Sequence, residues 1–367
     1  MIKTRHATPD DLSQLVYIEN TCFKVDRLSP RSFKRFIKPG SHDLLVLSEN
    51  QTIKAYALAL YRTGTNLARL YSIAVLPENQ GKGLAKQLLQ SIEKQVQQRY
   101  CVFIRLEVNV ANQRAIDLYT KLGYTTVGQI AEYYEDGADA LQMEKRLQKM
   151  PGKKIQSRPY YQQTTDFTCG PASLMMAIKT LNASYKMTRY EELQIWREAT
   201  TIYMMAGHGG CSPYGLALSA WNRGYQVTLY VNQAGIPFLD GVRGDEKKEV
   251  VQLVHESFLK QIRKTRIKLK VHQMETSELD KILDSGKPIL ALISTWLLNR
   301  NKVPHWVYVS GTDERFVYIN DPDIDGPHFS QTDYIQVPIE RELFFKIAKF
   351  GQKKLRSLLV LSGLQNE

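Results

Sequence analysis

The chain has 367 residues, a hydrophobic content of 43% and a formal net charge of +12. At roughly 100–200 residues per domain, this length predicts two domains. No apolar run approaches the ~18 residues that a membrane span needs, and no apolar block follows the early basic residues as a secretory signal requires. We expect a cytoplasmic protein with no membrane partner, and the sequence leaves its oligomeric state unknown.

The cysteine and acidic motifs do not indicate a metal site. The four cysteines, Cys22, Cys101, Cys169 and Cys211, form no Cys-x-x-Cys pair and are too few for a disulfide framework. Residues 321–326 open like a calcium-binding loop, but its twelfth position holds a threonine instead of a bidentate glutamate. We expect no bound metal. A lone cysteine can still act as a nucleophile.

The first part of the chain alternates between strand and helix patterns. Strand-like runs lie at 44–48, 55–61 and 103–110, with helical periodicity around them, which predicts an α/β layer structure. Residues 148–158 are polar, contain a glycine and a proline, and show neither period. They are expected to be a linker, between a first domain at 1–147 and a second at 159–367.

A glycine turn lies between a strand at 70–75 and a helix that begins at Leu84. Residues 80–85 contain Gly81 and Gly83, which allow a ligand to approach the backbone, and the N–H groups of a helix start attract phosphate. The Walker pattern is absent, and Lys86 stands where a dinucleotide fingerprint needs a third glycine. A glycine turn without any ligand remains an alternative.

The segment 106–124 makes the interpretation specific. It contains a strand end, Asn112 as a helix cap and Gly123 as the helix stop. Together with the glycine turn it resembles the GNAT acetyltransferase superfamily, and within it the ribosomal-protein alanine N-acetyltransferases, over about residues 1–147. The resemblance includes the opening residues 5–12, and residues 80–85 match the family's Q/R-x-x-G-x-G/A signature with alanine in the last place.

The resemblance implies a mixed, mostly antiparallel sheet with flanking helices, acetyl-CoA as co-substrate, and a peptide or protein amine as acceptor. It implies Glu107 as the general base and Tyr119 as the general acid, since the amine must lose a proton and the departing thiolate must gain one. An ordinary strand-end charge and a core aromatic are the alternatives for these two. Tyr133 and Tyr134 lie where related enzymes shape the acceptor pocket. The residues implied to hold acetyl-CoA are Ile73, Ala74, Val75, Gly81, Lys82, Gly83, Leu84, Ala85, Lys86 and Asn112.

The second part begins with an apolar helix at 169–182, and strand-rich sequence follows at 289–337. Helices first and strands later predict an α+β domain. Cys169 stands at the start of the helix, two residues before Pro171. Proline suits a first helical turn, and the positive end of the helix dipole stabilises a thiolate.

His305 and Asp321 are the expected partners of Cys169. A strand, a turn at 312–315 and a second strand separate them, so a hairpin can return the acid to the imidazole. This layout resembles papain-like cysteine peptidases, especially those that cleave leader peptides from bacteriocin precursors, over about residues 157–345. The resemblance implies Cys169 as nucleophile, His305 as base, Asp321 as the residue that orients the imidazole, and Gln163 as oxyanion donor. Asn320 is a rival for the orienting role.

Several features of the second part remain outside this motif. Residues 224–274 contain none, and the basic stretch 260–270 lacks interleaved aromatics, so we expect a solvated face there instead of a nucleic-acid site. His208 and Cys211 lie in a glycine-rich segment that we expect to be a loop near the cleft.

The sequence thus predicts a bifunctional enzyme that acetylates an amine and hydrolyses a peptide bond. The alternatives for the second half are an acyl or amide transferase and a non-catalytic peptide-binding module. A further hypothesis is that the peptidase exposes an amino terminus that the transferase then acetylates.

Overall fold

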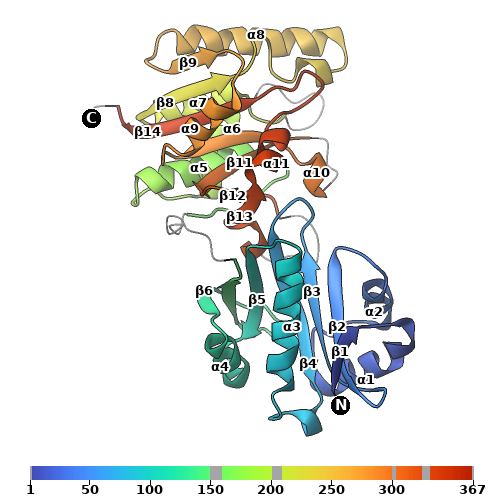
Figure 1. The fold of residues 1–367 in the computed structure, drawn as a ribbon. Helices are drawn as coiled ribbons and strands as arrows, with labels where there is room; N and C mark the ends of the chain where they lie inside the picture. The colour runs from blue at the N-terminus through green and yellow to red at the C-terminus, as the bar shows by residue number, and fades with distance from the viewer. Residues whose placement is uncertain (1, 149–158, 201–208, 300–302, 325–330, 366–367) are drawn as a thin grey trace. The chain divides into compact units, whose positions relative to one another are not determined.

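The computed structural model divides into two compact units, Met1–Pro151 and Gly152–Glu367 (Figure 1). Most of the expected linker at 148–158 lies outside the described residues. The residues that the structure describes are 2–148, 159–200, 209–299, 303–324 and 331–365. Among them, no helix is both long and apolar enough to cross a membrane.

The first unit is a seven-stranded sheet with helices on both faces, as expected. Its strands follow the order β1-β2-β3-β4-β5-β7-β6, and only β4 and β5 run parallel. Its elements are β1 (Lys3–His6), η1 (Pro9–Asp11), α1 (Leu12–Cys22), α2 (Pro30–Ile37), β2 (His42–Glu49), β3 (Thr52–Tyr61), β4 (Leu67–Val75), η2 (Pro77–Asn79), α3 (Leu84–Gln98), β5 (Phe103–Asn109), α4 (Gln113–Lys121), β6 (Thr125–Ile130) and β7 (Ala140–Arg146).

The two faces of this sheet bury two separate apolar clusters. On β3, Ala55 and Ala57 join the cluster that contains the buried face of α3, while Tyr56 and Leu58 join the cluster with α1 and α2. Successive side chains of a strand point to opposite faces, so a nearly continuous apolar strand serves both layers. The same alternation holds along the neighbouring strand β4, so only every second side chain of β4 can face a ligand on a given side of the sheet.

The pairing between β4 and β5 is short. Leu67–Arg69 pairs with Phe103–Arg105, whereas β4 continues to Val75 and β5 to Asn109. Beyond Arg69 the strand β4 is paired with β3 alone among the described strands. Beyond Arg69, one edge of β4 therefore has no neighbouring strand among the described strands, and backbone groups on this edge can bond a ligand. The carbonyl of Val75 already accepts from the side chain of Gln80 at 3.2 Å.

The second unit also has a seven-stranded sheet, in the order β13-β12-β11-β10-β14-β8-β9. The expected α+β class is confirmed, and the hairpin at 304–320 forms as β11 and β12. Its elements are α5 (Cys169–Leu181), α6 (Arg189–Ala199), α7 (Pro213–Asn222), β8 (Tyr225–Val231), η3 (Leu239–Gly241), α8 (Asp245–Ile262), β9 (Lys268–Val271), α9 (Thr276–Leu283), β10 (Ile289–Ser294), α10 (Trp296–Asn299), β11 (Pro304–Thr312), β12 (Phe316–Asn320), η4 (Gln331–Tyr334), β13 (Val337–Glu340), α11 (Arg341–Ile347) and β14 (Ser357–Leu364).

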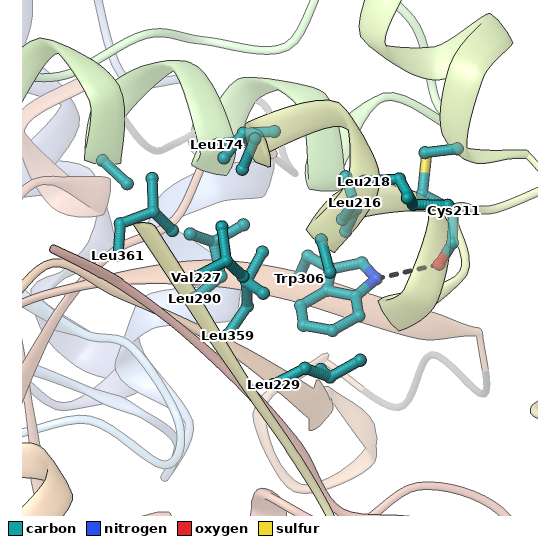
Figure 2. Close-up of a cluster of buried hydrophobic side chains, with 14 of the residues drawn as sticks. Leu174, Cys211, Leu216, Leu218, Val227, Leu229, Leu290, Trp306, Leu359 and Leu361 are labelled. Carbon is teal, nitrogen blue, oxygen red and sulfur yellow. Dashed lines mark hydrogen bonds between the residues drawn. The ribbon is translucent and has the colours of Figure 1, made fainter. Parts of the chain in front are cut away.

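The helix α5 is the centre of this unit. Every residue from Cys169 to Ile178 is buried, and α5 packs against β11 through a cluster that surrounds Trp306 (Figure 2). The indole Nε1 of Trp306 donates to the carbonyl of Cys211 at 3.2 Å. Burial of a side chain this large anchors β11 beside the start of α5. The opposite face of the sheet packs against α9 and α11.

Candidate functional sites

The glycine turn of the first unit leaves open space beside its backbone. Gly81 and Gly83 have φ of 80° and 79°, and a Cβ added at either position meets no atom within 4 Å. Gly83 is the N-cap of α3, so the unpaired N–H groups of the first helical turn begin here. A phosphate fits this turn because the left-handed glycines expose the backbone and α3 supplies its positive end. Lys82 lies within the turn, between the two glycines, and Lys86 lies in the first turn of α3.

The other residues assigned to acetyl-CoA lie beside this turn. Ile73, Ala74 and Val75 form the end of β4, on the strand whose far edge is open. Leu84 and Ala85 begin α3. Asn112 caps α4 by accepting the N–H of Ala115 at 3.2 Å, and Arg114 of α4 donates to Gln80 of the turn at 2.7 Å. These residues fit a nucleotide with a pantetheine arm: the turn suits the phosphates and the β4 edge suits the amides.

Glu107 is buried and ion-paired. Its Oε2 accepts from Nε of Arg69 at 2.8 Å and lies 2.7 Å from a terminal nitrogen of the same guanidinium. That guanidinium also donates to the hydroxyl of Tyr133 at 2.6 Å. Arg69 stands where β4 and β5 separate. Arg69 is not among the residues predicted for the site. The signal in the sequence is an arginine within an apolar strand, where a buried charge needs a partner.

Tyr119 lies in the core cluster beneath α3 and α4, 6% exposed and packed against Tyr124. Burial raises the pKa of Tyr119 well above its ordinary value. The phenol therefore keeps its proton at neutral pH, which is the form that a general acid needs.

Cys169 is the first residue of α5 and is 7% exposed. The backbone N–H of Trp306 points at its sulfur, at 3.5 Å. The sequence analysis did not include Trp306, since a core aromatic in a strand carries no sign of this contact. The first turn of α5 and the strand β11 thus hold the sulfur from two directions.

His305 lies between Asp321 and Cys169. Its Nε2 is 2.7 Å from Oδ1 of Asp321, and the sulfur of Cys169 lies near enough to the ring to contribute to its raised pKa. Burial by itself lowers the pKa of His305, but the charge and hydrogen bond of Asp321, together with the sulfur, outweigh burial and hold that pKa well above its ordinary value. The arrangement can keep a proton on the imidazole beside a thiolate.

The structure distinguishes Asp321 from Asn320, the two candidates for the residue that orients the imidazole. The side chain of Asn320 bonds the backbone on both sides: its amide donates to the carbonyl of Pro159 at 2.9 Å, and its oxygen accepts the N–H of Gln336 at 2.8 Å. Asp321, rather than Asn320, contacts the imidazole.

Gln163 is held beside this strand end, where its N–H donates to the carbonyl of Pro322 at 2.9 Å. Its Oε1 is buried and accepts no hydrogen bond from the described residues.

A cavity of about 1210 Å³ opens onto Cys169, His305 and Asp321. One wall comes from residues 233–243, in the stretch without a sequence motif, and another from residues 350–355. Phe238 and Phe350 contact each other across these walls, 5.9 Å between ring centroids. The cavity is large enough for several residues of a peptide.

The segment around Cys211 was expected to be a loop near the cleft, and residues 209–211 agree with this only in part. Gly209 and Gly210 line the cavity, whereas Cys211 is buried behind them. His208 and residues 325–330 of the calcium-like loop lie outside the described residues.

Both halves of the chain match a known family. Residues 7–147 match the model of the acetyltransferase (GNAT) domain, and residues 158–362 match that of the Peptidase_C39 like family. The two resemblances drawn from the sequence are confirmed at this level, as are the fold of the first domain and acetyl-CoA as its co-substrate.

Named relatives cover the first domain. An N-alpha-acetyltransferase of Saccharolobus solfataricus is 31% identical over 39% of this chain and 92% of its own length. The [ribosomal protein bS18]-alanine N-acetyltransferase of Escherichia coli is 31% identical over 29% of this chain and 71% of its own length. The crystal structure of the ribosomal-protein-S18-alanine N-acetyltransferase from Escherichia coli aligns with a TM-score of 0.38 and 26% identity, covering 41% of this chain and 97% of the other.

Replacing Asp321 by Asn is expected to lower the pKa of His305, because burial then acts on the imidazole without the opposing carboxylate. The NMR titration of the His305 ring measures it, with Asp323→Asn as the control. A raised histidine pKa stabilises the fold below the unfolded value of about 6.5, and this stabilisation is lost as the pH rises through the folded pKa. The stability deficit of Asp321→Asn is therefore expected to be largest below pH ~6.5 and to shrink only as the pH rises through the folded pKa. An unchanged ring titration contradicts the pairing.

Proposed function

This chain belongs to the Peptidase_C39 like family and, through its first domain, to the GNAT N-acetyltransferases, and we propose that it acetylates the α-amino group of a protein or peptide and hydrolyses peptide bonds with Cys169. The first activity is carried by the glycine turn beside an open β4 edge. The second is carried by the contact of His305 with both Asp321 and Cys169.

The choice of an α-amine as acceptor rests on the relatives, whose names state N-alpha and alanine N-acetylation. The chemistry of the site agrees with it. Acetyl-CoA supplies an activated acetyl thioester when it is bound. Glu107 receives a proton from the acceptor ammonium, and the neutral amine attacks the thioester carbonyl. The C–S bond then breaks, and Tyr119, which keeps its phenolic proton, supplies that proton to the leaving thiolate.

Arg69 gives Glu107 a fixed place in this reaction. Both side chains are buried, with 6% and 4% of their surface exposed, and a carboxylate at this depth needs a partner for its charge. The guanidinium joins it to Tyr133, one of the two tyrosines expected at the acceptor pocket. We propose that this chain of contacts aligns the base with the acceptor amine.

Replacing Glu107 by Gln is expected to lower kcat for acetyl transfer by about 100-fold or more, since a general base contributes 10²–10⁴-fold. The KM for acetyl-CoA is expected to change little, because the amide does not touch the glycine turn. Mass spectrometry of peptides with free amino termini measures the product. Glu144→Gln is the matched control, since Glu144 pairs with Arg105 at 2.6 Å in the same sheet, outside the site. Equal losses in the two variants would contradict the proposed role.

The peptidase mechanism follows from the order of contacts. His305 takes the proton of Cys169, and Asp321 stabilises the resulting imidazolium. The thiolate attacks the peptide carbonyl, the amine leaves with the imidazole proton, and water then cleaves the thioester. The N–H of Cys169 at the helix start and the amide of Gln163 are the proposed oxyanion donors.

Replacing Cys169 by Ala is expected to abolish peptide cleavage and to leave acetyl-CoA binding unchanged, because the two sites lie in separate units. Incubation with candidate precursor peptides and acetyl-CoA, read by mass, measures cleavage and acetylation together. Adding an amine as a competing acceptor distinguishes hydrolysis from acyl transfer. Cleavage that persists in Cys169→Ala contradicts the proposal.

A further inference from the structure

Glu192 is a buried carboxylate that takes no part in the two proposed mechanisms. It lies on α6, is fully buried, and accepts four hydrogen bonds from one segment of the chain. Its Oε1 accepts the N–H of Thr164 at 2.8 Å and the hydroxyl of Thr168 at 2.5 Å. Its Oε2 accepts the hydroxyls of Thr164 at 2.7 Å and Tyr161 at 3.0 Å. All four of these donors are neutral. Hydrogen bonds to the carboxylate, and not an ion pair, therefore offset its loss of contact with water.

The positions of the donors link Glu192 to the cysteine site. Thr164 directly follows Gln163, and Thr168 directly precedes Cys169. The two groups proposed to bind the oxyanion are therefore each one residue away from a residue that Glu192 holds. A single carboxylate fixes the distance between the two ends of this segment.

The bond to Thr168 also affects the helix start. Thr168 is the N-cap of α5, but its hydroxyl donates to Glu192 and makes no capping hydrogen bond. A threonine in this position ordinarily accepts an N–H of the first turn. Such a cap bonds the second or third helical residue, here Gly170 or Pro171, and Pro171 has no N–H. The N–H of Cys169, the first helical residue, is not bonded to any described residue and can donate to a substrate oxygen.

The same segment is tied to the residues around Asp321 on its other side. The hydroxyl of Tyr160 donates to the carbonyl of Asp321 at 3.0 Å, and Gln163 donates to that of Pro322. Glu192 holds the segment 160–168 on one side, and the residues just after β12 hold it on the other. These contacts align the segment with both Cys169 and Asp321.

We propose that Glu192 is the positioning residue of the oxyanion site, holding Gln163 and the N–H of Cys169 at the spacing that a tetrahedral oxygen requires. This inference rests on the proposed peptidase function. Glu192 does not touch the substrate, and its effect is confined to reactions that pass through an oxyanion.

Two chemical probes separate this role from a general loss of structure. p-Nitrophenyl acetate acylates a thiolate: the C–S bond forms, the C–O bond breaks and p-nitrophenolate leaves, through a carbonyl oxyanion. Iodoacetamide alkylates the same sulfur by displacing iodide, with no oxyanion. The ratio of the two rates at Cys169 therefore reports on the oxyanion site alone.

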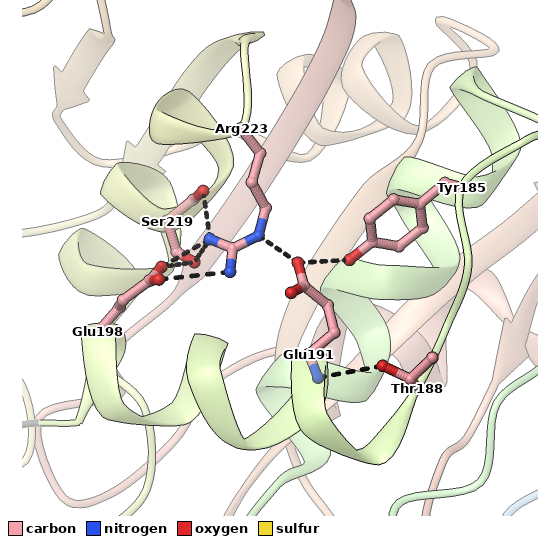
Figure 3. A network of polar contacts seen from close by, with 6 residues as sticks. All are labelled: Tyr185, Thr188, Glu191, Glu198, Ser219 and Arg223. Atoms are coloured by element: carbon pink, nitrogen blue, oxygen red, sulfur yellow. Dashed lines mark hydrogen bonds and ion pairs between the residues drawn. The ribbon is translucent and has the colours of Figure 1, made fainter.

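The variant is Glu192→Gln, whose amide keeps only one accepting oxygen for four donors. The matched control is Glu191→Gln on the same helix. Glu191 accepts from Arg223 at 2.6 Å and from Tyr185 at 2.9 Å, in a network that joins α6 to α7 (Figure 3). Both variants replace a charged acceptor on α6 by a neutral one. Only Glu192→Gln removes an acceptor that bonds the segment before Cys169.

In Glu192→Gln, acylation of Cys169 is expected to fall by about 10-fold or more, while alkylation stays within about 3-fold of the wild-type rate. Glu191→Gln is expected to keep both rates per folded molecule. Thr168→Val removes the bond to Glu192 nearest Cys169, together with the contacts of the same hydroxyl to Thr165. It is expected to act like Glu192→Gln and serves if that variant does not fold. Unchanged acylation, or a parallel fall of both rates, overturns the inference. A wild-type Cys169 that reacts with neither probe overturns the peptidase function itself.

Discussion

The contact of one buried imidazole with a carboxylate and a thiol is the constraint on which the site of the second domain depends. The thiol stands at the start of α5, the imidazole near the start of β11 and the carboxylate just after β12. Trp306 is central to their alignment. Its indole fills the core between α5 and the sheet (Figure 2), and its backbone N–H faces the sulfur of Cys169. Packing and chemistry thus use the same residue of the chain.

Each domain buries charged groups, and the cost of removing them from water is offset by a different kind of partner in each case. Glu107 faces a guanidinium, which fixes it by charge. His305 faces a carboxylate, which raises its pKa against the effect of burial. Glu192 faces four neutral donors, which fix it by hydrogen bonding alone. In all three cases the partner also sets the position of the group. Removal of the partner leaves the two carboxylates as buried charges without compensation and lowers the pKa of the imidazole.

Much of both sites could be predicted because the signals are local. The glycine turn, the cap at Asn112 and the cysteine at a helix start are each short patterns with a physical cause. The tertiary partners could not be predicted in this way. Arg69 meets Glu107 from a different strand, Glu192 collects donors that share no periodicity, and β14 inserts between β8 and β10 from the far end of the chain. The stretch 224–274 shows no motif, yet it supplies a cavity wall.

The reactivity of the four cysteines tests the central claim most directly. Burial raises the pKa of Cys22 to about 11 and that of Cys101 to about 12, and it raises the pKa of Cys211 well above its ordinary value. These three thiols stay protonated at neutral pH, whereas Cys169 has an imidazole to take its proton. Alkylation of the wild-type protein by iodoacetamide, followed residue by residue with mass spectrometry, is predicted to modify Cys169 far faster than the other three. Comparable rates at all four would contradict the account.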